Sequence, residues 1–166
     1  PHGGVPFLLI EPGKGIAESI AICRYFEALQ PKPSLFGETP FDQANIEMWR
    51  RIIEYDGLSA VGESFRNGAK AFKGRAFAGP QRIEQIPALI ERGKIRSDLL
   101  FDKVNSQLTN KKFIASNGFS IADIDAYVTC VFAKWIKLDA TENRPAIKKW
   151  LNMIEERPSI IALNQN

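Results

Sequence analysis

The most regular hydrophobic pattern in the chain begins at Ser120 and continues to Ile136. Ser120 is a typical N-cap, and Asp123 three residues later completes a capping box at the start of a helix. Between residues 126 and 135 nearly every face of this helix is apolar, which is typical of a helix buried in a core or in a membrane. Because the apolar run is too short and too interrupted to span a bilayer, it predicts the central buried helix of a helical domain.

A second amphipathic pattern covers residues 39–67 and predicts a long helix. Thr39 is its N-cap, Pro40 takes the first helical position, and Asp42 completes a second capping box. Gly57 and Gly62 lie inside the pattern, where each costs about 1 kcal/mol relative to alanine. They indicate either close helix packing or a bend that opens a cleft. The positions expected to face inward are Phe41, Ala44, Met48, Ile52 and Tyr55, with Trp49 and Ile53 beside them.

Two more helices complete the predicted bundle. One begins between residues 82 and 87 and ends near Leu108, and the other covers about residues 144–156 before Pro158, with a last turn near residues 160–163. The sequence therefore predicts an all-helical domain of about five helices over residues 38–166. The inward positions of these two helices are expected to be Leu89, Leu100, Val104 and Leu108, and Ile147, Leu151 and Ile154.

The first third of the chain has a different pattern. A buried strand is predicted over residues 5–10, a turn at 11–14, a short strand at 15–17 and a helix at 19–29, which ends before Pro31 and Pro33. Its apolar side is expected to carry Ile22, Cys23, Phe26 and Leu29. Two strands and one helix bury too little surface to be stable alone. We therefore expect residues 1–33 to be the last part of a larger α/β domain whose first part precedes this chain, joined to the bundle by a proline-rich linker.

Composition is that of an ordinary globular protein, with 45% apolar and 25% charged residues. A net charge of +3 is only weak support for a nucleic-acid partner. The loop at residues 68–81 interleaves Lys70, Lys73 and Arg75 with Phe72 and Phe77. Such a pattern occurs in nucleic-acid sites, but a surface lid or packed connection is more common for one short loop. We expect no nucleic-acid partner and no membrane partner.

Cysteine and histidine usage limits the possible chemistry. Cys23 and Cys130 lie far apart in the sequence, so two reduced, buried thiols in a cytoplasmic protein are expected. His2 is the single histidine, which makes a histidine-based metal site or a Ser/His/Asp triad a poor hypothesis. We expect no metal site. Arg50 and Arg51 stand four residues from Glu54 and Glu47, so a solvated salt-bridge face is expected for them, with a ligand contact as the alternative.

Two short motifs remain as candidate binding elements. Pro6 after Val5 opens a strand and is compatible with a cis peptide bond, which would free the Val5 backbone to pair with a peptide-like ligand. The alternative is an ordinary proline at a strand edge. Glu18 and Ser19 stand at a helix start, where amides and a hydroxyl can hold a carboxylate and Glu18 can accept from an ammonium group. On spacing alone, simple helix capping is the favoured interpretation of that pair.

Taken in order, the motifs resemble a cytosolic glutathione transferase of the bacterial, theta-like or beta-like kind. The resemblance covers essentially the whole chain. It rests on Val5-Pro6, Glu18-Ser19, the Ser120 to Asp123 capping box and the closing Arg157-Pro158-Ser159. It implies a mainly α fold, in which an all-helical C-terminal bundle follows a β-β-α remnant of a thioredoxin-like domain. It also implies that Val5 pairs with the cysteinyl part of glutathione, with Pro6 in cis, and that Glu18 and Ser19 hold the γ-glutamyl end.

The activity implied by the resemblance is detoxifying conjugation of glutathione, as co-substrate, to hydrophobic electrophiles by a cytoplasmic homodimer. The electrophile is expected between the strands and the long helix, under the 70–77 loop. The family's catalytic hydroxyl or thiol lies near the start of the thioredoxin-like domain, outside this sequence, so no catalytic residue is assigned. We expect this chain alone to be inactive. The alternative is a non-catalytic, transferase-like module used for dimerisation or docking.

Overall fold

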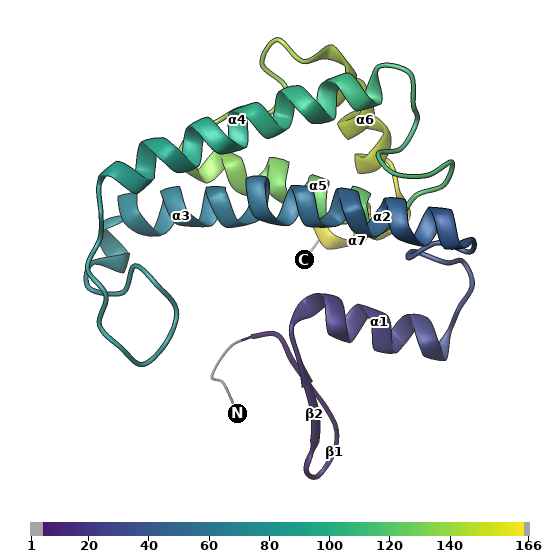
Figure 1. Ribbon diagram of the computed structural model, residues 1–166, viewed down its shortest axis with the longest axis horizontal. Coiled ribbons are helices and arrows are strands. Elements are labelled where there is room, and N and C mark those ends of the chain that lie inside the picture. Colours follow the sequence, from purple (N-terminus) through teal and green to yellow (C-terminus); the bar gives the residue numbers. More distant parts are fainter. Residues whose placement is uncertain (1–4, 165–166) are drawn as a thin grey trace.

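The computed structural model describes residues 5–164, so His2 lies outside the described residues. Over this range the chain is mainly helical, with one hairpin before the first helix (Figure 1). The elements are β1 (Phe7–Glu11), β2 (Lys14–Ala17), α1 (Ser19–Leu29), α2 (Pro40–Ile53), α3 (Ser59–Gly68), α4 (Ala88–Leu108), α5 (Ile121–Ala133), α6 (Pro145–Glu155) and α7 (Pro158–Asn164). No helix in this range is both long enough and apolar enough to cross a bilayer.

The N-terminal unit is a two-stranded antiparallel hairpin followed by α1. Phe7 pairs with Ala17, and Gly13 has a φ of 83°, the left-handed conformation that its turn position requires. The prediction of a buried strand is wrong, because most of β1, including Leu9, is exposed. Two strands have only one neighbour each and no second layer to cover them. Phe26 and Leu29 of α1 are exposed for the same reason, whereas Ile20 and Cys23 pack against the core of the bundle.

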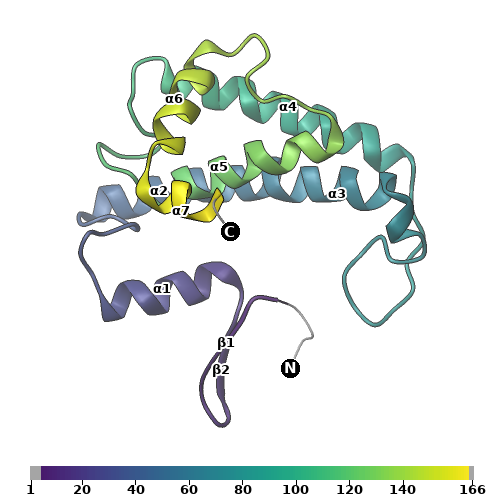
Figure 2. The ribbon, with the colours of Figure 1, turned by 180° about the vertical axis from the view of Figure 1, so that it is seen from behind.

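The bundle is built around one long helical rod. A π-helical turn at Glu54–Leu58 joins α2 directly to α3, so that residues 40–68 run without a break. The helix α4 lies along α3, α5 lies along α2, and α6 packs on α4 (Figure 2). The inward positions predicted for α4 and α6 are confirmed at Leu100, Val104, Ile147 and Ile154.

Gly57 allows the rod to approach its neighbours closely. A Cβ placed there would lie 2.7 Å from Leu100 of α4 and 2.7 Å from Thr129 of α5. Gly93 of α4 plays the same part, since a Cβ there would collide with the carbonyl oxygen of Ala60 in α3. Of the two interpretations of Gly57, close packing is therefore the one that the structure supports.

The predicted central helix is confirmed with one correction. Asp123 accepts hydrogen bonds from the backbone N–H of Ser120 and of Ile114 at 3.0 and 3.1 Å, which closes the capping box and ties down the preceding loop. The Nε1–H of Trp150 in α6 also donates to this carboxylate. The helix is not buried on every side, however. Val128 of α5 and Trp135 of the 3₁₀ turn that follows it are exposed.

The apolar stripe expected to face inward on α2 is wrong. Phe41 is 76% exposed, and Met48 and Tyr55 are also exposed. These three residues are seven apart, so they form one line on the outer side of the rod. The buried side carries Trp49 and Ile53, which were expected beside the stripe and are confirmed as buried, together with Ile46. Periodicity showed two apolar stripes on this helix, and it did not decide which of them meets the core.

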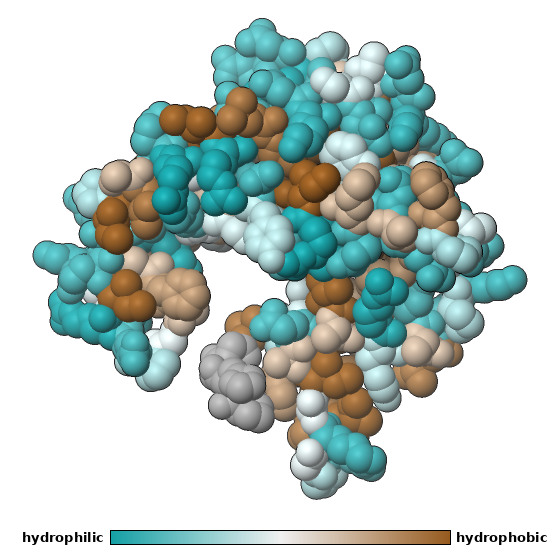
Figure 3. Space-filling model, in the orientation of Figure 1, coloured by the Kyte–Doolittle hydropathy of each residue, from teal (hydrophilic) through white to brown (hydrophobic). Residues whose placement is uncertain are grey.

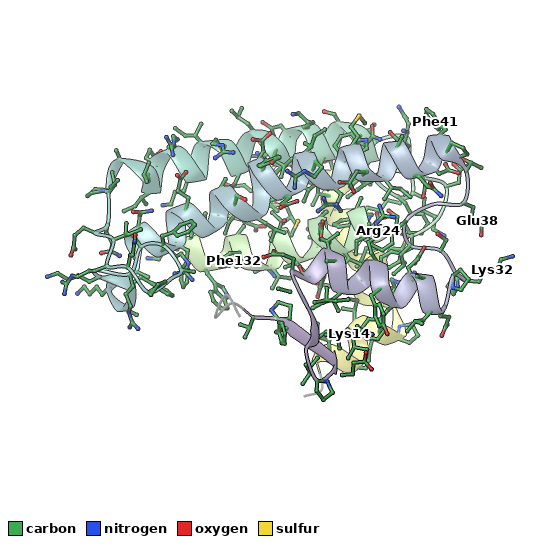
Figure 4. The ribbon with its side chains drawn as sticks, turned by 60° about the horizontal axis from the view of Figure 1, so that its bottom comes forward. Lys14, Arg24, Lys32, Glu38, Phe41 and Phe132 are labelled. Atoms are coloured by element: carbon green, nitrogen blue, oxygen red, sulfur yellow. The ribbon has the colours of Figure 1, made fainter. Side chains whose placement is uncertain are left out.

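The segment between α1 and α2 is attached to the bundle. Phe36 is only 2% exposed and belongs to the hydrophobic core, and the N–H of Ile121 donates to the carbonyl of Leu35 at 2.9 Å. Arg24 of α1 lies over the ring of Phe36, with its guanidinium carbon 3.9 Å from the ring centroid, and reaches toward α2 (Figure 4). The N-terminal unit is thus held against the bundle by Leu35 and Phe36 of this segment and by Arg24 of α1.

Candidate functional site

A pocket of about 340 Å³ lies where the start of α1 faces the bundle. Glu18 and Ser19 border it from the junction between β2 and α1, Arg50 and Arg51 from α2, and Asp125 from α5. A larger pocket of about 780 Å³ lies between the end of α4 and α6, bordered by Lys111 and Lys149. None of the predicted site residues borders the larger pocket, so the smaller one is the candidate site.

Glu18 occupies the N-cap position of α1 in an unusual conformation. Its φ is 71°, in the left-handed region that residues other than glycine rarely adopt. Its side chain makes no capping hydrogen bond, which argues against the interpretation that this residue only caps the helix. Between residues 5 and 164, neither the Glu18 carboxylate nor the Ser19 hydroxyl has a hydrogen-bond or ion-pair partner. Both polar groups are exposed and available to a ligand.

Val5 and Pro6 lie at the same end of the hairpin as Glu18. The pairing of Phe7 with Ala17 brings the residues before β1 beside the residues after β2. The peptide bond between Val5 and Pro6 is cis, and Val5 is 93% exposed. The two motifs are therefore neighbours, although Val5 and Pro6 do not border the pocket itself.

Arg50 and Arg51 differ in their surroundings. Arg50 is only 6% exposed and forms ion pairs with both Glu47 and Glu54 at 2.8 Å, so the prediction of a solvated salt-bridge face is wrong for it. The hydrogen bond from Arg50 lowers the pKa of Glu47. Arg51 is partly exposed and pairs with Glu54 at 2.7 Å. The pair expected between Glu47 and Arg51 is replaced by the one between Glu47 and Arg50.

Asp125 is a pocket residue that the sequence interpretation missed. It is 8% exposed, and burial raises its pKa to about 6. Arg50 opposes that rise, whereas the carboxylates of Glu54 and Glu47 add to it. The signal was an aspartate within the apolar run of the central helix, two residues after the aspartate of the capping box.

The two thiols are not poised for chemistry. Burial raises the pKa of Cys23 and, more strongly, that of Cys130, to about 12. Cys130 is buried as expected, whereas Cys23 of α1 is only half-buried and packs against the core of the bundle. In the part of the chain that the structure describes, no three His, Cys, Asp or Glu side chains come together as a metal site.

The pocket combines both signs of charge within a small volume. The guanidinium groups of Arg50 and Arg51 border it from α2. The Glu18 carboxylate and the Ser19 hydroxyl, which have no partner among the described residues, border it from the start of α1. The first amides of α1 add a partial positive charge, as at any helix N-terminus. This arrangement suits a small ligand end that carries both an anionic and a cationic group.

Comparison with known proteins identifies the family of this chain. The sequence model described as "Glutathione S-transferase, C-terminal domain" matches residues 70–158. The curated "Glutathione S-transferase 2" of Saccharomyces cerevisiae is 31% identical over 163 residues, which are 95% of this chain. A solved class Gtt2 glutathione S-transferase of Vibrio parahaemolyticus is 31% identical, with a TM-score of 0.81 over 95% of this chain and 72% of that one. Solved Gtt2 of Saccharomyces cerevisiae is 27% identical, with a TM-score of 0.87 over 97% of this chain and 75% of that one.

The matches also show what share of each relative's length this chain covers. It spans 66% of the curated yeast protein and 45% and 47% of two probable glutathione S-transferases of Nicotiana tabacum. The predicted fold, a helical bundle preceded by a β-β-α unit, agrees with these relatives, whereas the theta-like or beta-like subclass stays a prediction. The chain belongs to the glutathione S-transferase family.

Proposed function

We propose that this chain provides the γ-glutamyl part of the glutathione site in a transferase that joins glutathione to hydrophobic electrophiles. The observation that carries the proposal is the Glu18-Ser19 pair, unpartnered and facing Arg51 across one pocket. The conformation of Glu18 supports it, because residues held at positive φ cost about 1–3 kcal/mol and gather at ligand sites.

In this proposal the tripeptide lies along the end of the hairpin. The Ser19 hydroxyl and the amides at the start of α1 hold the γ-glutamyl carboxylate, and Glu18 accepts a hydrogen bond from the ammonium group. The exposed backbone of Val5, next to Pro6, pairs with the cysteinyl part. The division into a glutathione-binding unit at residues 1–33 and a helical domain at 38–166 follows from this assignment.

The reaction needs the glutathione sulfur as a thiolate, since the thiolate and not the thiol is the nucleophile. The thiol proton leaves to solvent, the sulfur forms a bond to the electrophilic carbon, and the leaving group departs with its bonding electrons. The raised pKa values of Cys23 and Cys130 give neither of them a part in this step. We assign no catalytic residue within the chain.

An aromatic cluster is proposed to take the electrophile. Phe65 of α3 makes edge-to-face contacts with Phe72, Phe132 and Trp135, with ring centroids 5.3 to 5.7 Å apart. Phe72 belongs to the loop at residues 70–77 that we propose as a lid. Trp135 is exposed, so the cluster presents an apolar surface to which a hydrophobic substrate can bind.

Homodimerisation through the helices is the proposed explanation for the outer stripe on α2. Phe41, Met48 and Tyr55 are exposed there, and Ile95 and Leu99 are exposed on neighbouring α4. Figure 3 shows apolar groups interrupting the polar surface on the face that carries these helices. We propose that a second copy of the chain covers these exposed apolar side chains, since apolar surface exposed on one face often marks a protein–protein interface.

Isothermal titration with reduced glutathione tests the proposed site. We expect binding by the wild-type protein and about tenfold weaker binding by Ser19→Ala, because a hydrogen bond to a charged group contributes about 1.5–3 kcal/mol. Ser106→Ala, an exposed serine of α4, is the matched control and should bind like wild type. Equal binding by all three proteins contradicts the role of Ser19, and absence of binding by wild type contradicts the proposed function. Binding without conjugation of 1-chloro-2,4-dinitrobenzene by the full protein would favour a docking module.

A further inference from the structure

Two aspartates of α5 are both buried but differ in their partners. The carboxylate of Asp123 accepts hydrogen bonds from Ser120, Ile114 and Trp150. The carboxylate of Asp125 accepts none from any residue between 5 and 164, and it forms no ion pair there. Among the described residues, the fully buried polar side-chain atoms without a partner are Ser64 Oγ and Arg157 Nε, so the Asp125 oxygens keep some contact with the pocket. Because polar groups at a residue buried this deeply are nearly always satisfied, this unpartnered carboxylate at the pocket needs an explanation.

The surroundings of Asp125 do not supply a free counter-charge. Arg50 and Arg51 of α2 border the same pocket, but the guanidinium group of Arg50 is already shared between Glu47 and Glu54, and that of Arg51 pairs with Glu54. From α1, the residue that interacts electrostatically with Asp125 is the neutral thiol of Cys23. The carboxylate therefore stands in an environment with more negative than positive groups, and it borders the pocket.

We propose that Asp125 is a ligand-binding residue whose carboxylate accepts a hydrogen bond from the ammonium group at the amino-acid end of the bound tripeptide. This inference rests on the proposed function and adds a residue to the same site. Ser19 and Arg51 then face the ligand carboxylate, and Glu18 and Asp125 face the ammonium group from opposite walls. The ammonium group brings the counter-charge that the free protein lacks at this position.

A ligand role and a structural role predict opposite effects of the same substitution. If Asp125 stabilised the fold, Asp125→Asn would lower stability at neutral pH. An unpaired buried carboxylate instead disfavours folding, so the isosteric amide should keep or raise stability while weakening ligand binding. The raised pKa of Asp125 agrees with the second expectation. Near pH 8 the group is ionised. The charged side chains around it are Arg50, Arg51, Glu47, Glu54 and Glu18.

Calorimetric titration with two ligands at pH 8 tests the proposal. The ligands are glutathione and its deaminated analogue, glutaryl-cysteinyl-glycine, which lacks the ammonium group. We expect Asp125→Asn to bind glutathione at least tenfold more weakly than wild type and to bind the analogue as wild type does. Glu91→Gln, an exposed carboxylate at the start of α4, should change neither affinity.

Each other outcome has a defined meaning. If Asp125→Asn weakens the binding of both ligands equally, or does not weaken the binding of glutathione, the assignment of Asp125 is overturned. The proposed function stays in place in that case as long as wild type binds glutathione. Binding of neither ligand by wild type overturns the proposed function and this inference together. Thermal unfolding of Asp125→Asn checks that the variant is folded, and Asp125→Ala, with no hydrogen-bonding group, should reproduce its ligand preference.

Discussion

The carboxylate of Glu27 in α1 accepts a hydrogen bond from the backbone N–H of Phe36 at 3.2 Å. The same carboxylate accepts from the hydroxyl of Ser34 at 2.6 Å and from the N–H of Leu35 at 3.1 Å. Because Phe36 is in the core of the bundle, these bonds connect the N-terminal unit to the helical part. One side chain thus sets how α1, which begins at Glu18 and Ser19, is placed against α2 and α5.

We predict that Glu27→Gln lowers the free energy of unfolding by about 1–2 kcal/mol at pH 7, because hydrogen bonds to a charged acceptor are weakened. Burial raises the pKa of Glu27, but the hydrogen bonds from Ser34, Leu35 and Phe36 outweigh it, so the net shift is downward. This stabilisation is therefore present above the unfolded-state pKa and lost as the pH falls through the lower folded-state pKa. Urea denaturation at pH 7 and pH 3 measures it. Glu38→Gln, at an exposed position, is the control, and equal stability of both variants at pH 7 would contradict the prediction.

The buried capping box of α5 should contribute more than the exposed cap of α2. Asp123→Ala would leave buried donors on Ser120, Ile114 and Trp150 without an acceptor, at about 1–3 kcal/mol for each unsatisfied group. We expect a total loss of about 3–5 kcal/mol, since such losses are not fully additive. Thr39→Ala removes the cap that accepts from the N–H of Asp42 and should cost about 1 kcal/mol. Chemical denaturation compares the two variants, and similar losses in the free energy of unfolding would contradict this ranking.

Two glycines of the rod should respond in opposite directions to alanine. Gly57→Ala introduces a Cβ 2.7 Å from Leu100 and from Thr129, and we expect destabilisation by about 1–3 kcal/mol. Gly62→Ala meets only Phe132, at 3.9 Å, so the better helix propensity of alanine should raise stability by about 0.5–1 kcal/mol. Thermal unfolding of both variants is the measurement. A stabilised Gly57→Ala protein would show that α4 and α5 give way more easily than their packing indicates.

Asp125→Asn should change the pH dependence of stability. The folded-state pKa of about 6 lies above the ordinary value of 3.8, so ionised Asp125 disfavours folding above pH 6. Wild-type stability therefore gains from protonation of this group as the pH falls from 6 to 4. Relative to wild type, the amide variant should be more stable by about 1–3 kcal/mol at pH 8, and the difference should vanish below pH 4. Denaturation at several pH values measures the trend, and a constant difference would contradict it.

The outer stripe of α2 gives a prediction about assembly. If a second copy covers Met48, then Met48→Glu should convert the protein to a monomer, because a buried unpaired charge is costly at an interface. Light scattering after size exclusion measures the mass. Phe77→Glu, at an apolar position in the loop after α3 that is more exposed than Met48, is the control and should leave the mass unchanged. A monomeric wild-type protein would remove the proposed dimer.

Much of the fold could be predicted from local signals. Ser120 with Asp123, Thr39 with Pro40, and Pro145 mark helix starts in the sequence, and the structure has helices at each of them. The long helix was also predicted, but its π-helical turn was not. Gly57 lies in that turn and packs closely against Leu100 and Thr129, which are distant in sequence. A local pattern contains no information about such contacts.

The candidate site was predicted in part. Glu18 and Ser19 drew attention because a helix start can bind an anion, and the structure places both at a pocket. Arg50 was misjudged, because spacing shows that an ion pair can form and does not show whether it is buried. Asp125 was missed for a related reason. The distinction between it and Asp123 depends on donors from Ile114 and Trp150, which reach one carboxylate and not the other.

The attachment of residues 34–36 has a consequence for engineering by recombination. These residues belong to the proline-rich linker between α1 and α2, which looks like a natural crossover point because the hairpin lies before it and the bundle after it. Yet one wall of the pocket comes from before it and the other from after it, and Phe36 and Leu35 are fitted into the later part. A chimera joined here inherits Ser19 from one parent and Asp125 from the other. Ligand binding at the pocket would then depend on whether α1 packs in the same position against α2 and α5 in both parents.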